Sequence, residues 1–388
     1  MKKKIGILGS TGSIGTTLLN VINKKNTEVY FLMANKNYKK ILKQAKLYSV
    51  KYVIITDKTS FKKAKKFNNN KKIIIINNYN FHEIIDTKLD YVMSAITGIA
   101  GLKPTFEIIK FTKNIAIANK ESIICAWPLI KKELIKRNTE FVPVDSEHFS
   151  IWSEINKIDV NKIDKIYLTA SGGPLLNYKS KNKKKIKISS ILKHPTWKMG
   201  GKISVDSATM MNKCYEIIEA KNLFNLEYKQ IKILIHPNSY IHAIILYKNG
   251  LSKIVLHDTT MKIPIFNSIY GTNTPYKYDN KIDINKLNNL KLQQVKTKEY
   301  PIIKCLKYLQ NNHTLYETVI VTINDFFVDK YLKKKINFFD ISKLVLKFIN
   351  NDKFKIYKKS SANSVDEILN LNEFIKNELK NFYLTWLI

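Results

Sequence analysis

The sequence predicts an α/β protein in three parts: a doubly wound parallel sheet at the N-terminus, an α+β domain in the middle and a helical domain at the C-terminus. Short apolar strands alternate with helical segments through the first third, the pattern of a parallel sheet with crossover helices. From about residue 150 strands follow one another with few helices between them, and after about Pro301 the apolar spacing becomes helical. The expected domains are 1–149, 150–271 and 298–388, with a polar linker at 272–297.

Each element is expected from its own apolar run. The strands of the first part are expected at 4–8, 28–34, 52–56, 73–76, 91–94 and 115–118, with helices at 15–24 and 38–48. The strands of the middle part are expected at 165–170, 231–236, 242–247 and 252–257. Helices at 301–310, 316–332, 341–349 and 365–381 would build the last domain.

Length and composition favour a globular chain outside the membrane. The 388 residues are 45% hydrophobic and 25% charged, and no apolar run approaches the roughly 18 residues that a membrane span needs. The N-terminal lysines precede an apolar stretch that is too short for a signal peptide and has no small-residue cleavage site. Three widely spaced cysteines without a Cys-x-x-Cys pair fit a reducing compartment. We therefore expect a cytoplasmic protein with no membrane partner.

The net charge of +35 is typical of proteins that bind nucleic acid, but the kind of basic residue argues against it. All 66 basic residues are lysine except Arg137, whereas nucleic-acid binding relies on bidentate arginine contacts. Lysine is spread along the chain with abundant Asn, Ile, Tyr and Phe, apart from dense runs such as 181–187. This composition indicates an A+T-rich genome, such as that of a host-restricted bacterium, and predicts no nucleic-acid partner.

A glycine-rich loop follows the first expected strand. Gly9-Ser-Thr-Gly12-Ser-Ile-Gly15 joins that strand to a helix, so the backbone can approach a pyrophosphate at the helix N-terminus. A structural turn is the alternative, but the strand–loop–helix context favours a Rossmann-like dinucleotide site. The second strand then ends in Asn35-Lys36-Asn37, where an acid would favour NAD. The missing acid and the lysine favour NADPH, although Lys36 alone is also explained by the general excess of lysine.

Three carboxylates form a candidate metal site. Asp145 and Glu147 are expected in an extended segment, where residues i and i+2 point to one side. Asp-x-Glu alone is usually a solvated turn, but Glu216 offers a third carboxylate, and such oxygens favour Mg²⁺ or Mn²⁺ over zinc. His148 is equally explained as a buried structural residue, and we do not assign it to the metal.

The segment 194–219 carries the densest set of functional side chains. After a Gly-Gly turn we expect a short strand at 202–205, and then a helix capped by Asp206 or Ser207. Thr209, Asn212, Lys213 and Glu216 would share one face of that helix, which suits a phosphorylated, metal-bound ligand. An amphipathic surface helix is the alternative. It leaves unexplained the Trp197-Lys-Met-Gly-Gly approach, which resembles a lid more than a linker.

Two further strand ends carry polar side chains. Asn119-Lys120-Glu121-Ser122 follows the strand at 115–118, at the edge where open α/β sheets bind ligands. Ser171-Gly172-Gly173 follows the strand at 165–170 and could hold a phosphate through its hydroxyl and backbone N–H groups. An ordinary helix start and an empty tight loop are the respective alternatives.

Taken together and in this order, these motifs resemble the 1-deoxy-D-xylulose 5-phosphate reductoisomerase family. The resemblance covers residues 1 to about 270 and extends more faintly to the C-terminus. It implies NADPH contacts from Thr11, Gly12, Ser13, Ile14, Asn35, Lys36, Asn37, Asn119, Glu121 and Gly200. It implies metal ligation by Asp145, Glu147 and Glu216. It implies substrate contacts from Lys120, Ser146, Glu147, Ser171, His194, Ser207, Asn212, Lys213 and Glu216, with Lys120, Lys213 and Glu147 as catalytic residues.

The resemblance also implies the reaction. Metal-polarised 1-deoxy-D-xylulose 5-phosphate would rearrange by retro-aldol cleavage and re-addition, and NADPH would reduce the resulting aldehyde to 2-C-methyl-D-erythritol 4-phosphate in the methylerythritol phosphate route to isoprenoids. Lys120 and Lys213 would stabilise oxyanions or transfer protons, and the stretch around Trp197 and Met199 would close as a lid. A homodimer is expected on the same grounds.

Some positions depart from the family pattern. Asn35 and Ala170 stand where glycine is common, Trp127 follows Cys125 where small residues are usual, and 322–325 replaces a more regular Ala-Ala-Asn-Glu run. Three rival functions remain for comparison: a basic nucleic-acid-binding protein, an ordinary NADP-dependent dehydrogenase and an inactive relative. The single arginine argues against the first, the third carboxylate and the phosphate-site hydroxyls against the second, and the intact metal and phosphate residues against the third.

Overall fold

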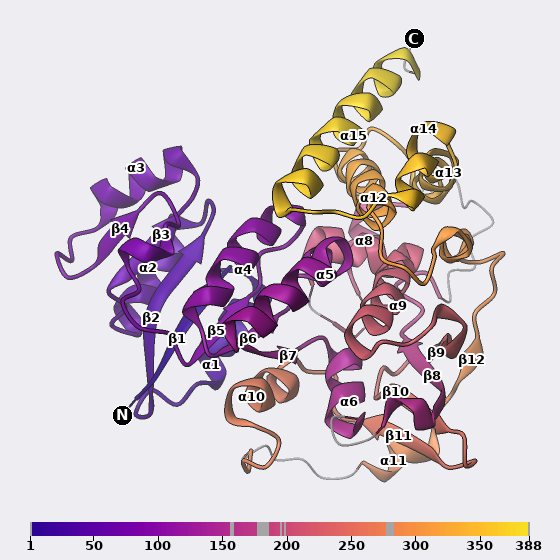
Figure 1. The fold of residues 1–388 in the computed structure, drawn as a ribbon, viewed down its shortest axis with the longest axis horizontal. Helices are drawn as coiled ribbons and strands as arrows, with labels where there is room; N and C mark the ends of the chain where they lie inside the picture. Colours follow the sequence, from indigo (N-terminus) through magenta and orange to yellow (C-terminus); the bar gives the residue numbers. More distant parts are fainter. Residues whose placement is uncertain are drawn as a thin grey trace. The chain divides into compact units, whose positions relative to one another are not determined.

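The computed structural model describes residues 2–155, 159–176, 186–194, 196–197, 199–276 and 283–386. The chain divides into two compact units (Figure 1). The first unit consists of Met1–Ile123, Pro128–Phe149 and Met261–Lys277, and the second of Ile124–Trp127, Ser150–Thr260 and Tyr278–Ile388. Residues 181–185 of the lysine-rich run lie outside the described part. Among the described residues, every helix is too short or too polar to span a bilayer.

The first unit is built on a parallel sheet of seven strands in the order β4-β3-β2-β1-β5-β6-β7. The order reverses at β1, as in a doubly wound sheet, so the predicted fold class is confirmed. The register is continuous from β2 to β3, while a shift between Ile5 and Gly6 interrupts the β1–β2 pair. The strands are β1 Lys3–Leu8, β2 Thr27–Ala34, β3 Tyr52–Ile55, β4 Ile74–Ile76, β5 Tyr91–Ser94, β6 Asn114–Ile117 and β7 Glu140–Pro143.

Helices alternate with these strands along the chain and bury their apolar faces against the sheet. On α2, for example, Ile41, Leu42 and Ala45 join the core at helical spacing. The exposed lysines of this helix are Lys39, Lys43 and Lys46. Helix α5 bends at Ala126 because Pro128 cannot continue the backbone ladder. The helices before β7 are α1 Ser13–Val21, α2 Tyr38–Leu47, α3 Lys58–Phe67, α4 Leu102–Ile108 and α5 Lys120–Arg137, with 3₁₀ turns η1 Phe81–Glu83, η2 Ile99–Gly101 and η3 Ile109–Phe111.

Helix α10 (Lys262–Tyr270) belongs to the first unit, although we expected residues up to 271 in the middle domain. Ile265 and Ile269 lie in the same apolar core as β1, and the Ser268 hydroxyl lies 2.7 Å from the hydroxyl of Tyr91. A segment far along the chain therefore completes the N-terminal core. Sequence periodicity alone does not reveal a return of this kind.

The second unit is built on a mixed sheet of five strands in the order β11-β10-β8-β9-β12. Strands β8 and β9 are parallel, whereas β10 is antiparallel to both β8 and β11. Strand β12 pairs antiparallel with β9 and lies within the expected linker 272–297, of which residues 277–282 are outside the described part. The strands are β8 Ile163–Ala170, β9 Ile231–Ile235, β10 Ile241–Tyr247, β11 Ser252–Leu256 and β12 Gln293–Gln294.

The last part of the chain is helical, as predicted, and α12 packs on both α13 and α15. The stretch after Pro301 forms a 3₁₀ segment instead of the expected α-helix. The α-helices after β7 other than α10 are α6 Ser146–Ile155, α7 Ile188–Leu192, α8 Gly201–Thr209, α9 Met211–Phe224, α11 Ile284–Asn288, α12 Tyr316–Leu332, α13 Phe338–Ile349, α14 Asp352–Lys355 and α15 Val365–Trp386. The 3₁₀ segments are η4 Val160–Lys162, η6 Tyr228–Gln230, η7 Pro301–Tyr308 and η8 Ile356–Lys359.

The strand expected at 202–205 was wrong, since these residues form the first turns of α8. Ile203 and Val205 suggested a strand, but the Gly200 carbonyl accepts hydrogen bonds from the Ser204 N–H and hydroxyl and starts a helix. The helix ends at Met210, whose φ of +74° is left-handed, and α9 starts anew at Met211. Tertiary packing has overridden local β propensity here.

A buried acid on α12, Glu317, makes the stability of the fold depend on pH. Glu317 accepts hydrogen bonds from the N–H and hydroxyl of Thr314 at 3.1 and 2.8 Å. Burial raises the pKa of this carboxyl to about 7, while the hydrogen bonds from Thr314 and the charge of Lys221 oppose the shift. The folded protein therefore holds a proton that the unfolded chain releases, with its ordinary pKa near 4.5, at lower pH.

We expect Glu317→Gln to change how stability depends on pH. In the wild type the free energy of unfolding should fall as pH rises from about 4.5 to about 7, because the unfolded state loses the proton first. The variant should lack this decline, which amounts to roughly 3 kcal/mol at 1.36 kcal/mol per pKa unit. Urea unfolding at pH 5 and pH 8 measures this decline. An equal change in the free energy of unfolding between the two pH values in both proteins would contradict the assignment.

Candidate active site

The glycine loop lies at the carboxyl end of β1 and requires its glycines. Gly9 has a φ of +85°, and a Cβ there would lie 2.5 Å from the Ala95 carbonyl oxygen. A Cβ on Gly15 would lie 2.6 Å from the Gly9 carbonyl oxygen. Helix α1 then starts after Gly12 without a side-chain cap. Its first-turn N–H groups therefore suit an anionic ligand, as predicted for a pyrophosphate.

Helix α2 is hydrogen-bonded to this loop through Lys40 and Gln44, which the sequence analysis missed. Gln44 accepts a hydrogen bond from the Ser10 hydroxyl at 3.0 Å and donates one to the Ser10 carbonyl at 2.9 Å. The Lys40 ammonium donates to the Thr11 carbonyl at 2.8 Å. Asn37, Lys40 and Gln44 recur at helical spacing, which was the available signal, but only the folded contact connects them to the loop.

The polar residues after β2 lie beside the same loop. The N–H groups of Gly9 and Ser10 both donate to the Met33 carbonyl, which joins the loop to the end of β2. Asn35, Lys36 and Asn37 are exposed there. Asn37 caps α2 by accepting from the Lys40 N–H, and the Asn35 amide donates to Thr56 at 2.8 Å. Lys36 thus places an exposed positive charge just beyond the end of β2, the strand whose Met33 carbonyl holds the loop.

The side chain of Asn119 forms hydrogen bonds within the protein. Its amide donates to the carbonyls of Ile96 and Gly98 and to Glu121, while its carbonyl oxygen accepts from the N–H and hydroxyl of Ser122. The side chain is buried and caps α5. Its predicted NADPH contact, like that of the buried Glu121, stays a prediction.

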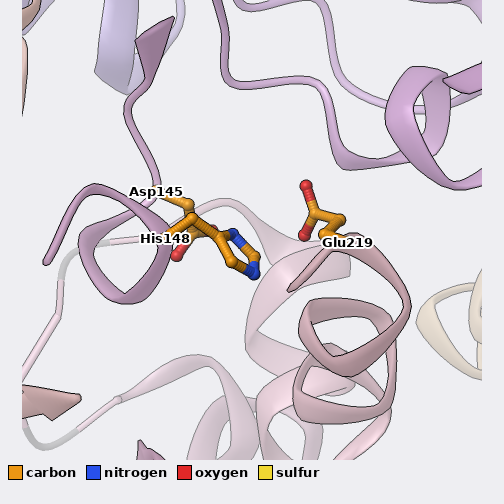
Figure 2. Close-up of side chains that lie close together, drawn as sticks. All are labelled: Asp145, His148 and Glu219. Carbon is orange, nitrogen blue, oxygen red and sulfur yellow. The ribbon is translucent and has the colours of Figure 1, made fainter. Parts of the chain in front are cut away.

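Asp145 and Glu147 sit at the start of α6, not in the extended segment that we expected. The helix begins at Ser146, so Glu147 is in its first turn, and the Ser146 hydroxyl donates to the Glu147 carboxylate at 2.6 Å. Asp145 forms an ion pair with the Lys120 ammonium, and both side chains are less than one-fifth exposed. Figure 2 shows Asp145 with His148, which is buried in the same first turn.

Helix α9 of the second unit carries the third expected acid. Glu216 is only 1% exposed; its carboxylate accepts from the Asn212 amide at 2.5 Å and forms an ion pair with the buried Lys213 ammonium. Thr209 lies on α8, before the break at Met210, so the expected stripe of four residues is reduced to three. Glu219 follows one turn later on α9 and is also buried (Figure 2).

Carboxylates in both units have the chemistry of metal ligands. Asp145, Glu147 and Glu216 all offer hard oxygen atoms, which suit Mg²⁺ or Mn²⁺, while Asp145, His148 and Glu219 form a second set with a nitrogen ligand. A buried carboxylate is costly unless a cation or hydrogen bonds compensate it. At Asp145 and Glu216 a lysine supplies that positive charge.

Ser171, His194 and Ser207 form a polar cluster within the second unit. The His194 Nε2 lies 3.1 Å from the hydroxyl oxygens of both serines. The loop after β8 turns through Gly172 and Gly173, with φ values of +82° and +70°, and the Gly173 N–H donates to the Ser171 hydroxyl at 3.0 Å. Hydroxyls, an imidazole and a backbone N–H therefore converge here, as a phosphate site requires.

The protonation of His194 follows from its surroundings. Its Nδ1 accepts a hydrogen bond from the Trp197 N–H at 3.0 Å, which places the ring proton of the neutral form on Nε2. Burial lowers the pKa of His194 to about 4, so the ring is neutral at physiological pH. It can then donate from Nε2 to an anionic oxygen without carrying a charge itself.

The expected lid is partly described. Trp197 is half-buried, and its ring lies edge-on to the His242 ring with 6.3 Å between the ring centroids. His242 in turn stacks on His257, with 3.7 Å between the ring centroids. Gly200 is exposed and caps α8, and its predicted NADPH contact is untested. Pro195 and Lys198 of the same stretch lie outside the described residues.

Comparison with known proteins gives one consistent result. Sequence profiles described as 1-deoxy-D-xylulose 5-phosphate reductoisomerase match residues 5–127, and profiles of its C-terminal domains match residues 141–224 and 256–378. The protein of that name from Pelagibacter ubique is 53% identical over 385 residues, covering 98% of this chain and 99% of the relative. The Clostridium tetani protein is 37% identical, covering 98% of this chain and 100% of the relative.

Solved structures agree with the sequence relatives. A crystal structure of DOX-P reductoisomerase in complex with NADPH, fosmidomycin and magnesium superposes with a TM-score of 0.91 at 28% identity, covering 99% of each chain. The reductoisomerase from Zymomonas mobilis in complex with NADPH gives a TM-score of 0.86 at 28% identity, again covering 99% of each chain.

Proposed function

The chain belongs to the 1-deoxy-D-xylulose 5-phosphate reductoisomerase family, and from this premise we propose that the side chains described above perform the family reaction. The protein is an oxidoreductase that converts 1-deoxy-D-xylulose 5-phosphate to 2-C-methyl-D-erythritol 4-phosphate with NADPH and a divalent metal. The observation that carries the assignment of residues is the pairing of Glu216 with Lys213 and of Asp145 with Lys120.

We propose that NADPH binds at the glycine loop of the first unit. The requirement for glycine at positions 9 and 15 and the uncapped start of α1 fit a pyrophosphate. Lys36, exposed beside that loop and accompanied by Asn35 and Asn37, fits the extra phosphate that distinguishes NADPH from NADH. Thr11, Gly12, Ser13 and Ile14 belong to the loop and first helical turn that would contact the cofactor.

The metal ligands proposed are Asp145, Glu147 and Glu216. The donor set is all carboxylate, which fits Mg²⁺ or Mn²⁺, and two of its members already have a cationic partner. When bound, the metal supplies Lewis-acid polarisation of the substrate oxygens, and NADPH supplies the hydride. The protein's own task at this point is to supply three carboxylates, two of which pair with a lysine.

The lysines and the polar cluster then have separate roles. The Lys120 and Lys213 ammonium groups each form an ion pair with a neighbouring carboxylate, and we propose that each stabilises an oxyanion or donates a proton. Ser171, His194, Ser207 and Asn212 would hold the substrate phosphate, far from the reacting carbons. Binding energy from the phosphate would orient the substrate, and Trp197 would help to exclude water.

We propose that the protein is a cytoplasmic homodimer. The three cysteines are buried thiols, which fits a reducing compartment such as the bacterial cytoplasm, and the sequence relatives named above are bacterial. A homodimer follows from the resemblance alone. A host-restricted source stays a prediction.

The proposed function predicts NADPH oxidation that needs both 1-deoxy-D-xylulose 5-phosphate and Mg²⁺ or Mn²⁺. Glu216→Gln keeps the size of the side chain but removes the ligand charge, so turnover should fall by a factor on the order of 10³, since removing one electrostatic contribution to catalysis costs about that much. Loss of NADPH absorbance measures turnover, and quenching of protein fluorescence measures NADPH binding, which should stay within twofold of wild type.

A matched control is Glu317→Gln, which neutralises a carboxylate that is also buried but hydrogen-bonds to Thr314. This variant should retain turnover near the wild-type value at pH 8. A folded, metal-loaded wild-type protein without turnover would refute the function. A Glu216 variant that lost NADPH affinity as well would refute the residue's assignment to the metal.

Lys36→Ala should weaken the preference for NADPH over NADH. Removing a charge-assisted hydrogen bond to a phosphate costs about 1.5–3 kcal/mol, or at least roughly tenfold in kcat/KM for NADPH, with little effect on NADH. Lys39→Ala, which removes an exposed lysine from the first turn of α2, is the control and should leave the ratio unchanged. Equal losses with both coenzymes, or equal effects of both variants, would argue against a 2′-phosphate contact.

A further inference from the structure

Helix α8, which carries Ser207, is hydrogen-bonded to the C-terminal helical region through a buried carboxylate. Asp206, only 2% exposed, accepts a hydrogen bond from the Asn324 amide of α12 at 2.8 Å. Asn324 is fully buried, and because an ionised carboxylate only accepts, its NH₂ group must face Asp206. The residue adjacent to a proposed phosphate ligand is thus fixed by a residue 118 positions later in the chain.

A second contact joins the same two helices. The Lys202 ammonium lies 3.1 Å from the second carboxylate oxygen of Asp206 and 3.0 Å from Asp325 of α12. Neighbouring residues of α12 therefore hold α8 at two points one helical turn apart. The buried charge on Asp206 is compensated by one ammonium and one amide, so the loss of either partner leaves it underpaired.

The loop that carries Ser171 is held in a comparable way. Tyr300 directly precedes η7, and its hydroxyl donates a hydrogen bond to the Gly172 carbonyl at 2.7 Å in a buried contact. A Cβ on Gly173 would lie only 2.9 Å from the Ser207 carbonyl oxygen, so this loop and α8 are in close backbone contact. Residues 300–325 thus support both serines that flank His194 without belonging to that cluster.

We propose that Asn324 and Asp206 are a positioning pair that sets Ser207 for the substrate phosphate, and that Tyr300 does the same for Ser171. The inference rests on the proposed function, and it adds residues that do not contact substrate themselves. Small displacements of a binding group have large effects, since an error of about 1 Å can cost on the order of 10²-fold. The C-terminal helical region is therefore part of the specificity for a phosphorylated substrate.

The experiment compares Asn324→Ala with a control on the same helix. Thr322→Ala removes another buried hydrogen bond of α12, from Thr322 to Asn372 at 3.1 Å, on a contact to α15 instead of α8. We expect Asn324→Ala to raise the KM for 1-deoxy-D-xylulose 5-phosphate and the inhibition constant of inorganic phosphate by at least about tenfold. The KM for NADPH should stay within twofold, and Thr322→Ala should leave all three constants near wild type.

Two further variants distinguish a positioning role from a general loss of folding. Tyr300→Phe removes one hydroxyl and should raise the same two constants by a smaller factor. The double variant Asp206→Asn with Asn324→Asp reverses donor and acceptor. Relative to Asn324→Asp alone, it should recover at least half of the rise in the two constants, in logarithmic terms. No recovery, or equal shifts in Asn324→Ala and Thr322→Ala, would overturn the positioning role.

Hydrogen exchange separates this proposal from the proposed function. Backbone amides of residues 201–209 should exchange faster in Asn324→Ala than in Thr322→Ala, whether or not the enzyme turns over. A wild type without turnover would refute the proposed function, and this exchange comparison would still decide whether Asn324 fixes α8. Equal exchange in the two variants would overturn the positioning pair.

Discussion

The site depends on one constraint: carboxylates removed from water must be compensated by positive charge. Lys120 pairs with Asp145 in one unit, and Lys213 pairs with Glu216 in the other. Desolvation would otherwise favour the neutral acids, which are poor ligands for a divalent cation. The same pairs hold both ammonium groups beside the carboxylates that we propose as metal ligands. In the proposed function the pairing would serve metal binding and proton chemistry together.

Helix ends place these groups. Lys120 starts α5, Glu147 lies in the first turn of α6, and the left-handed Met210 separates α8 from α9. A positive φ in a non-glycine residue costs free energy and is retained where the surrounding structure determines it. At Met210 it lets the chain change direction between Ser207, near the end of α8, and Asn212 and Lys213, at the start of α9. One backbone break thus orients two sets of side chains that we propose for the site.

Local patterns in the sequence were sufficient for part of this structure. The glycine loop, the strands of the parallel sheet and the run that contains Glu216 could be predicted because each is specified by neighbouring residues. Residues 202–205 could not, since their β-branched side chains favour a strand and only tertiary packing makes them helical. Lys40, Gln44 and Asn324 were missed for a related reason: their partners lie 29, 34 and 118 positions away.

We propose that Asp145, Glu147 and Glu216 are the ligands of one divalent metal. The most direct measurement is anomalous scattering from crystals grown with Mn²⁺ and NADPH. We expect a single strong peak in each chain at about 2.1 Å from carboxylate oxygens of Asp145, Glu147 and Glu216, the distance typical of a small divalent ion with oxygen ligands. A peak bound instead by His148 and Glu219, with Glu216 still paired to Lys213, would contradict it.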